Sequence, residues 1–225
     1  MGRLLAQCKL ICIQKAHAPD HRNRLVRVLD NGKSVEYDYD HQNRLVRRND
    51  ELFVNDGWQV ACSLKNGRIA HRYLWGAVQD ELLAMDAHWA LRDHLNTVRK
   101  VIDTKDKIVS TLEYNAFGKL LNPTGDKPLF RYTGKMFDDA TGLQWNVNRW
   151  YDANLGRWIS EDPIGFRAGD TSIYRYVWSN PIRHKDFFGL FGCGTKRDVG
   201  NRIGLTEETA FSPCGWHLKS AARGI

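Results

Sequence analysis

Apolar and polar side chains alternate with a period of two over much of the N-terminal third of the chain. Val35, Tyr37 and Tyr39 alternate with polar or acidic neighbours, and this alternation is typical of a strand with one buried face. Turn dipeptides that tolerate positive φ angles separate such segments: Asn31-Gly32, Asp56-Gly57 and Asn66-Gly67. The pattern therefore predicts successive β-hairpins.

An internal repeat of 20 residues runs through this region. The segment His21-Arg22-Asn23-Arg24-Leu25-Val26-Arg27 returns as His41-Gln42-Asn43-Arg44-Leu45-Val46-Arg47. A unit of this length has room for two strands and two turns, because strands are about 5 residues long and hairpin loops about 2 to 5. Each repeat is therefore predicted to be one hairpin.

Residues 78–93 do not follow this alternation. Their apolar positions approximate the spacing of a helical face and no strong turn dipeptide interrupts them, so local propensity predicts a helix there. Strands are expected again farther along the chain: 98–102, 108–114, 130–133 and the aromatic run around Trp145, Trp150 and Tyr151. Residues 191–225 contain six glycines and no lasting alternation, so this segment is not expected to build a core of its own.

The chain carries 33 basic and 26 acidic residues, a formal net charge of +7. The excess is +4 over residues 1–50, +1 over residues 51–190 and +2 over residues 191–225. Acidic residues stand between the arginines of the repeat region, which is typical of a solvated strand face. A basic module that binds carbohydrate or nucleic acid is kept as an alternative function, although nucleic acid is not expected as a partner.

No segment predicts a membrane span or a signal peptide. The most apolar stretch near the start, residues 10–13, lies between two lysines. It is far shorter than the roughly 20 residues of a transmembrane helix and too short for the apolar region of a signal peptide. We therefore expect no transmembrane segment.

The cysteines do not predict a metal site. Cys8 and Cys12 fit one face of a buried strand. Cys193, Cys214 and His217 could supply three zinc ligands, but a fourth is not evident. The chain also lacks a phosphate-binding glycine motif and a Gly-x-Ser-x-Gly elbow. Neither a cofactor nor a bound metal is expected.

Residues 151–165, with the sequence YDANLGRWISEDPIG, carry a family signature. They are followed by Tyr174-Arg175-Tyr176-Val177 and Asn180-Pro181. Together these segments closely resemble the core signature of Rhs (rearrangement hot spot) and YD-repeat proteins. Upstream, Tyr39-Asp40 with Asn43-Arg44-Leu45 is similar to a YD repeat, and the resemblance covers about residues 20–190.

The resemblance implies an all-β fold in which tandem β-hairpins form a long sheet that spirals into a hollow cage. It implies β-structure for residues 78–93, in place of the helix that propensity predicts. It also divides the chain into YD-repeat-like hairpins at residues 1–77, an Rhs repeat-associated core at residues 78–190 and a short irregular C-terminal tip at residues 191–225. Complete cages hold many more repeats than 225 residues, so the chain is expected to be a fragment, the C-terminal part of a cage.

The resemblance also implies a function, that of the structural end of a cage. Family cages enclose and present a variable C-terminal polypeptide, often a polymorphic toxin, and the core closes one end. The expected partners are an upstream YD-repeat cage chain or the chain's own tip, together with an immunity protein or a secretion machinery. Export by a dedicated secretion system, or delivery at the cell surface, is implied as well.

Self-cleavage is the one reaction that the resemblance implies, and no independent enzyme activity is expected. In many family members two aspartates form a pair like that of an aspartic protease, and here they fall on Asp162, within Asp-Pro-Ile-Gly, and on Asp186, within Asp-Phe-Phe-Gly-Leu. Two carboxylates forced close together cannot both ionise, so one keeps a proton while the other activates water. The cut is expected between Leu190 and Phe191.

Phe187 departs from the family pattern, which has proline at this place. Proline fixes φ and restricts the residue before it, so its loss frees the backbone at Asp186 and is expected to loosen the position of that carboxylate. A purely structural role is the alternative for Asp162 and Asp186, because Asp often caps a turn. The sequence leaves the autoprotease and the structural role open.

Overall fold

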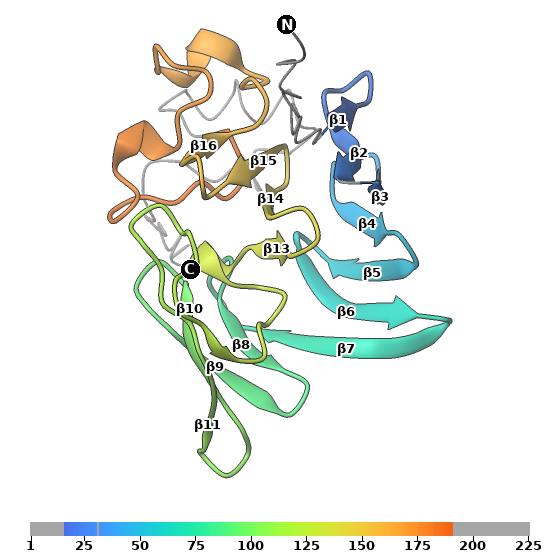
Figure 1. The fold of residues 1–225 in the computed structure, drawn as a ribbon, viewed down its shortest axis with the longest axis vertical. Coiled ribbons are helices and arrows are strands. Elements are labelled where there is room, and N and C mark those ends of the chain that lie inside the picture. The colour runs from blue at the N-terminus through green and yellow to red at the C-terminus, as the bar shows by residue number, and fades with distance from the viewer. Residues whose placement is uncertain (1–15, 31, 191–225) are drawn as a thin grey trace, which may run out of the picture.

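Two antiparallel sheets make up the described part of the chain, residues 16–30 and 32–190, in a computed structural model (Figure 1). The first sheet, called the wall, has strands that pair in sequence order: β1 (Ala16–Pro19), β2 (Leu25–Asp30), β3 (Lys33–Tyr39), β4 (Leu45–Arg48), β5 (Glu51–Asp56), β6 (Gln59–Lys65), β7 (Arg68–Trp75), β8 (Leu82–Met85), β9 (His88–Arg92), β10 (Val98–Ile102), β11 (Ile108–Thr111) and β12 (Thr124–Gly125).

The second sheet belongs to residues 126–190, called the C-terminal lobe. Its strands also pair in sequence order: β13 (Met136–Asp138), β14 (Leu143–Asn146), β15 (Arg149–Asp152) and β16 (Arg157–Trp158). The lobe also has three short 3-10 turns: η1 (Tyr132–Gly134), η2 (Gly165–Ala168) and η3 (Val177–Ser179). No α-helix occurs in the described residues, and the predicted all-β fold of tandem hairpins is confirmed.

A carboxylate caps each repeat turn. Asp40 Oδ1 accepts the backbone N–H groups two and four residues later, both at 2.9 Å, and its Oδ2 accepts the Arg44 side chain at 2.6 Å. Asn43, within this turn, has a φ of 66°, a left-handed conformation that Asn tolerates. Asp20 and Arg24 make the same contacts one repeat earlier. The repeated residues are therefore the ones that close the turns.

The repeat arginines also join one turn to the next. The Arg24 guanidinium donates to the carbonyl of Asp40 at 3.1 Å, and the Arg44 guanidinium donates to the carbonyl of Gly57 at 2.8 Å. Each arginine is also paired with the aspartate of its own turn. These cations therefore hold successive hairpins in register.

Residues 78–93 form a hairpin, so the helix predicted from propensity is wrong and the implied β-structure is confirmed. β8 and β9 meet at a two-residue turn that begins at Asp86, whose φ is 52°. The Asp86 carboxylate is hydrogen-bonded at 2.8 Å both to the His71 ring and to the Arg72 backbone N–H on β7. Leu83 is the extra residue of a bulge against β7. This extra residue breaks the strict alternation of apolar positions, so their spacing approximates that of a helical face.

The strand predicted at residues 130–133 is also wrong. The chain turns there through η1, because Thr133 and Gly134 have φ angles of 52° and 71°, which a strand does not allow. The strand predicted at residues 98–102 coincides with β10, whereas β11 is shorter than the predicted 108–114. Alternation of apolar and polar residues therefore predicted β10 correctly, where the backbone stays extended, and failed at residues 130–133, where the backbone turns.

The second sheet lies between the wall and the last loops of the lobe. One face of it joins the wall in a shared core, whose lobe members include Met136, Leu143, Trp145, Val147 and Trp150. The other face carries a second core made of Tyr132, Tyr151, Ala153, Trp158, Tyr176 and Val177. Large aromatic side chains stabilise a lobe with little regular structure, because each buries much apolar area. Polar groups on this second face are consequently shielded from solvent.

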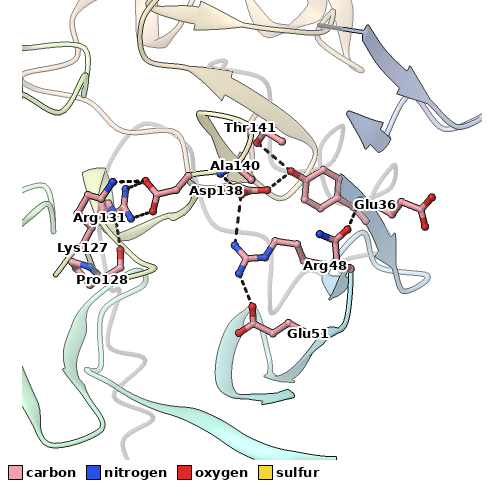
Figure 2. A network of polar contacts seen from close by, with 12 residues as sticks. Glu36, Arg48, Glu51, Lys127, Pro128, Arg131, Asp138, Ala140 and Thr141 are labelled. Atoms are coloured by element: carbon pink, nitrogen blue, oxygen red, sulfur yellow. Dashed lines mark hydrogen bonds and ion pairs between the residues drawn. The ribbon is translucent and has the colours of Figure 1, made fainter. Parts of the chain in front are cut away.

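Polar side chains bridge the wall and the lobe at the turn between β13 and β14 (Figure 2). Asp138, which is 1% exposed, accepts the hydroxyl of Tyr37 from β3, and its Oδ1 lies 3.7 Å from the Arg48 guanidinium. Arg48 is paired in turn with Glu51 of β5. Burial, and next the charge of Asp138, raises the pKa of Tyr37 well above its usual value, so the phenol stays protonated and donates.

Tyr37→Phe is expected to lower the free energy of unfolding by about 1–3 kcal/mol, because the buried Asp138 carboxylate loses a donor. Urea unfolding followed by tryptophan fluorescence measures the change. Tyr174→Phe is the control, since the Tyr174 hydroxyl contacts Glu161 at the surface, at 3.2 Å, and its loss should change stability by less than about 0.5 kcal/mol. Equal effects of the two substitutions would contradict the bridge.

Candidate functional site

Asp162 and Asp186 each open a tight turn in the C-terminal lobe. Asp162 Oδ1 accepts the N–H of Ile164 at 3.0 Å, and its backbone carbonyl accepts the N–H of Gly165 at 2.8 Å. Asp186 Oδ1 accepts the N–H of Leu190 at 3.0 Å, which is the four-residue contact seen in the repeat turns. Both acids are therefore turn caps, whatever else they do.

Arg149 of β15 brings the two carboxylates together. Its Nη2 lies 2.9 Å from Asp162 Oδ2 and 3.6 Å from Asp186 Oδ2. The side chains of all three residues are at most 5% exposed. Backbone carbonyls satisfy the rest of the guanidinium, since Nη1 donates to Ile173 at 3.1 Å and Nε donates to Gly189. The two predicted acids therefore share one buried cation.

Burial dominates the electrostatics of this cluster. It raises the pKa of Asp162 to about 6, and the charge of Asp186 adds to the rise. Arg149 and the N–H of Ile164 oppose the rise without cancelling it. Burial also lowers the pKa of Arg149, whose guanidinium lies 4.3 Å from the Trp158 ring centre and stays charged. The cluster therefore places a carboxyl group that holds a proton up to about pH 6 beside a second carboxyl and a cation.

The hairpin of β14 and β15 also holds the backbone of the 186–190 segment. Asn146 donates to the first carbonyl of this segment at 2.6 Å. Asn148 donates twice to the carbonyl of Phe188, from its side chain at 2.8 Å and from its backbone at 3.1 Å. Arg149 holds the next carbonyl. Three carbonyls that precede the expected cut are thus bound by one hairpin.

Phe187 is anchored by its ring in the absence of a proline. Lys135 Nζ lies 3.5 Å from the centre of the Phe187 ring, and the Phe188 ring meets it edge-on at 4.5 Å. Lys135 is itself buried and pairs at 2.9 Å with Asp80, from the loop between β7 and β8 of the wall. Burial lowers the pKa of Lys135 to about 8. The Phe187 side chain therefore ties its segment to the wall.

Resemblance to the family pointed to the two acids but not to the residues that hold them. In β14, Asn146 alternates with apolar neighbours, a pattern that predicts a solvent-facing side chain. It is 0% exposed, because the 186–190 segment lies across it. The signal that the sequence did contain was three polar residues, Asn146, Asn148 and Arg149, between the aromatic residues of a segment expected to be buried.

Several residues weighed from the sequence lie outside the described chain. Phe191, on the far side of the expected cut, is one, and the others are Cys8, Cys12, Cys193, Cys214 and His217. Within residues 16–30 and 32–190 no three His, Cys, Asp or Glu side chains form a group that could hold a metal ion. The same part of the chain contains no helix with the length and apolar character that crossing a membrane requires.

Comparison with known proteins identifies the kind of shell that the wall and lobe form. The family described as teneurin YD-shell matches residues 13–182. The chain belongs to this family of YD-repeat shells. Its relatives include Rhs proteins, so the resemblance drawn from the sequence is confirmed.

Two relatives and one solved structure show how far the similarity extends. The probable deoxyribonuclease RhsA of Dickeya dadantii is 39% identical over 85 residues, which are 38% of this chain and 6% of RhsA. Toxin subunit YenC2 of Yersinia entomophaga is 31% identical over 141 residues, 59% of this chain and 14% of YenC2. A crystal structure of TcdB2-TccC3 without its hypervariable C-terminal region has the same fold over 78% of this chain and 10% of that one, with a TM-score of 0.60 at 18% identity. This chain thus spans a small part of each.

Gly189→Ala is expected to displace the 186–190 segment and destabilise the lobe. Gly189 has a φ of 66°, and an added Cβ would lie 2.6 Å from the Asn146 carbonyl oxygen. Gly169→Ala is the matched control, because Gly169 has a φ of 76° but open space around its Cβ position. In urea unfolding, Gly189→Ala should cost about 1–3 kcal/mol more than the control. Equal costs would mean that the segment is not held against β14 and β15.

Proposed function

We propose that this chain forms the end of a YD-repeat shell and cuts itself after Leu190, which separates residues 191–225 from the lobe. The observation that carries the proposal is the meeting of Asp162 and Asp186 on the Arg149 guanidinium. Beside them lies a segment whose carbonyls are bound by one hairpin. Leu190 is also held close to the pair, since its N–H donates to Asp186 Oδ1 at 3.0 Å, and a reacting group held in position beside catalytic groups reacts faster.

The two acids divide the work of peptide hydrolysis between them. Asp162, with its pKa near 6, carries the proton. Asp186 takes a proton from water as the water oxygen bonds to the carbonyl carbon of Leu190. The carbon–nitrogen bond to Phe191 then breaks, and Asp162 gives its proton to the departing amino group. Arg149 keeps both carboxyl groups in place and offsets the negative charge of the pair.

The open wall supports the role as the end of a shell. In the described sheet β1 and β12 lie at opposite ends and do not pair with each other, so the sheet is not closed. Unpaired edge groups readily accept further strands, and additional YD-repeat hairpins are the proposed partner. The hypervariable C-terminal region named for TcdB2-TccC3 supports a variable segment after the lobe here as well. YenC2 is a toxin subunit, which favours a role in toxin delivery.

A purely structural role is the competing function for the two acids. Their turn contacts favour it, because Asp40 makes the same four-residue contact in a repeat turn of the wall. In that role Arg149 and the two aspartates form a buried ion cluster that only holds the last segment of the lobe. The two functions differ in one observable, the mass of the chain after incubation.

The purified chain is expected to yield a product that ends at Leu190, detected by intact mass spectrometry. Asp162→Asn and Asp186→Asn should each slow its formation at least about 100-fold, the usual size of a general acid or base contribution. Asp103→Asn is the control, since Asp103 caps an exposed turn with contacts of 2.8 and 3.0 Å and lies outside the cluster. An intact wild-type mass after prolonged incubation would leave only the structural role.

Cleavage is expected to slow as the pH rises above 6, because Asp162 then loses the proton that it donates. The protonated fraction falls about tenfold for each pH unit above the pKa. Rates of product formation measured from about pH 5 to about pH 8 should follow this fraction. A rate that stays constant or rises between about pH 6 and pH 8 would contradict Asp162 as the proton donor.

A further inference from the structure

Asn148 lies between the wall and the segment that precedes the proposed cut. Its Nδ2 donates to the carbonyl of Phe188 at 2.8 Å, and its Oδ1 accepts Nδ2 of Asn43 at 2.8 Å. Asn43 belongs to the second repeat turn, between β3 and β4, and its own Oδ1 accepts Arg24 of the first repeat at 3.4 Å. A continuous line of hydrogen bonds therefore runs from two repeat turns to Phe188.

A second wall residue reaches the same place. Trp58, between β5 and β6, meets the ring of Phe188 edge-on at a centroid distance of 5.3 Å. The wall thus contacts Phe188 at both its carbonyl, through Asn148, and its side chain. Phe188 stands only two residues before Leu190, so its position decides where the proposed scissile bond lies.

We propose that Asn43 and Asn148 are positioning residues that make self-cleavage depend on the docking of the repeat turns against the lobe. This inference rests on the proposed cleavage and adds that the contact between the repeat turns and the lobe controls it. When the turn that carries Asn43 is not docked, the Asn148 side chain loses its partner and Phe188 is held less firmly. A misplacement of about 1 Å is enough to slow a positioned reaction about 100-fold. The chain therefore cuts itself only after the wall has folded onto the lobe.

Asn43→Asp breaks this line of hydrogen bonds without removing a side chain. Aspartate tolerates the left-handed backbone of this position, where φ is 66°, but its carboxylate offers only acceptors. Asn148 must then turn its amide nitrogen toward residue 43 and its oxygen toward the Phe188 carbonyl, where two acceptors meet. Cleavage is expected to slow about tenfold or more, the effect of losing one hydrogen bond or leaving an acceptor unpaired.

Asn23→Asp is the matched control. Asn23 occupies the same turn position one repeat earlier, with a φ of 60°, and the line of described hydrogen bonds to Phe188 does not pass through it. Its substitution makes the same change of charge and shape in an equivalent turn. The cleavage rate of this variant should stay within about twofold of the wild-type rate.

Asn148→Ala tests the second member of the line. It should slow cleavage by a factor similar to that of Asn43→Asp, and the double variant should be no slower than the slower single one, because both changes break the same line. Residues that only support the fold would instead slow cleavage in proportion to lost stability, which urea unfolding measures in the Asp162→Asn background. Additive effects of the two substitutions would contradict the inference.

Hydrogen exchange separates a failure of this inference from a failure of the proposed cleavage. In the Asp162→Asn background, the Leu190 N–H that donates to Asp186 reports on the segment. Asn43→Asp should speed its exchange about tenfold, and Asn23→Asp should not. If exchange and cleavage are the same in both variants, the inference is overturned and the proposed cleavage stands. If the wild-type chain never cleaves, that function is refuted, and exchange still decides whether the repeat turns hold the segment.

Discussion

Arg149 is a positive charge buried between two carboxylates, and the C-terminal lobe is arranged to satisfy it. A buried guanidinium without partners costs several kcal/mol, so Nη2 requires Asp162 and Asp186 while the other nitrogens require backbone carbonyls. These partners come from the turn after β16, from Ile173 and from the end of the lobe. Pairing therefore draws three loops onto one face of the second sheet. The same contacts that complete the fold also assemble the site.

Aspartates that cap turns have two electrostatic outcomes in this molecule. Burial pushes the pKa of Asp40 upward in the wall, but hydrogen bonds from Arg44 and its neighbours outweigh burial, and the pKa ends below its usual value. Burial also raises the pKa of Asp162, and there it prevails, because the Asp162 side chain is 4% exposed whereas that of Asp40 is 18% exposed. A partly exposed turn with its own arginine holds an ionised carboxylate. A deeply buried turn holds a carboxyl group able to keep a proton.

Local patterns predicted the wall correctly where the turn chemistry is local. Asn66 and Gly67 have φ angles of 53° and 71°, as a type I′ hairpin turn requires, and the flanking strands pair as expected. Prediction failed at residues 78–93, where the bulge at Leu83 and the contacts of Asp86 depend on the neighbouring strand β7. Residues 78–93 alone do not show which residues of β7 they contact, so their local propensity predicted a helix in place of the hairpin.

By itself, the sequence determined the hairpin repeat and the residues that close its turns, because turn chemistry and alternation act between residues only a few positions apart. The two aspartates were singled out by the family resemblance. Only the tertiary structure decided that Asp162 and Asp186, 24 residues apart, meet on Arg149, and that Asn148 links a wall turn to Phe188. Those contacts follow from the packing of the second sheet between the wall and the last loops. Packing of that kind buries polar side chains that alternation alone would assign to solvent.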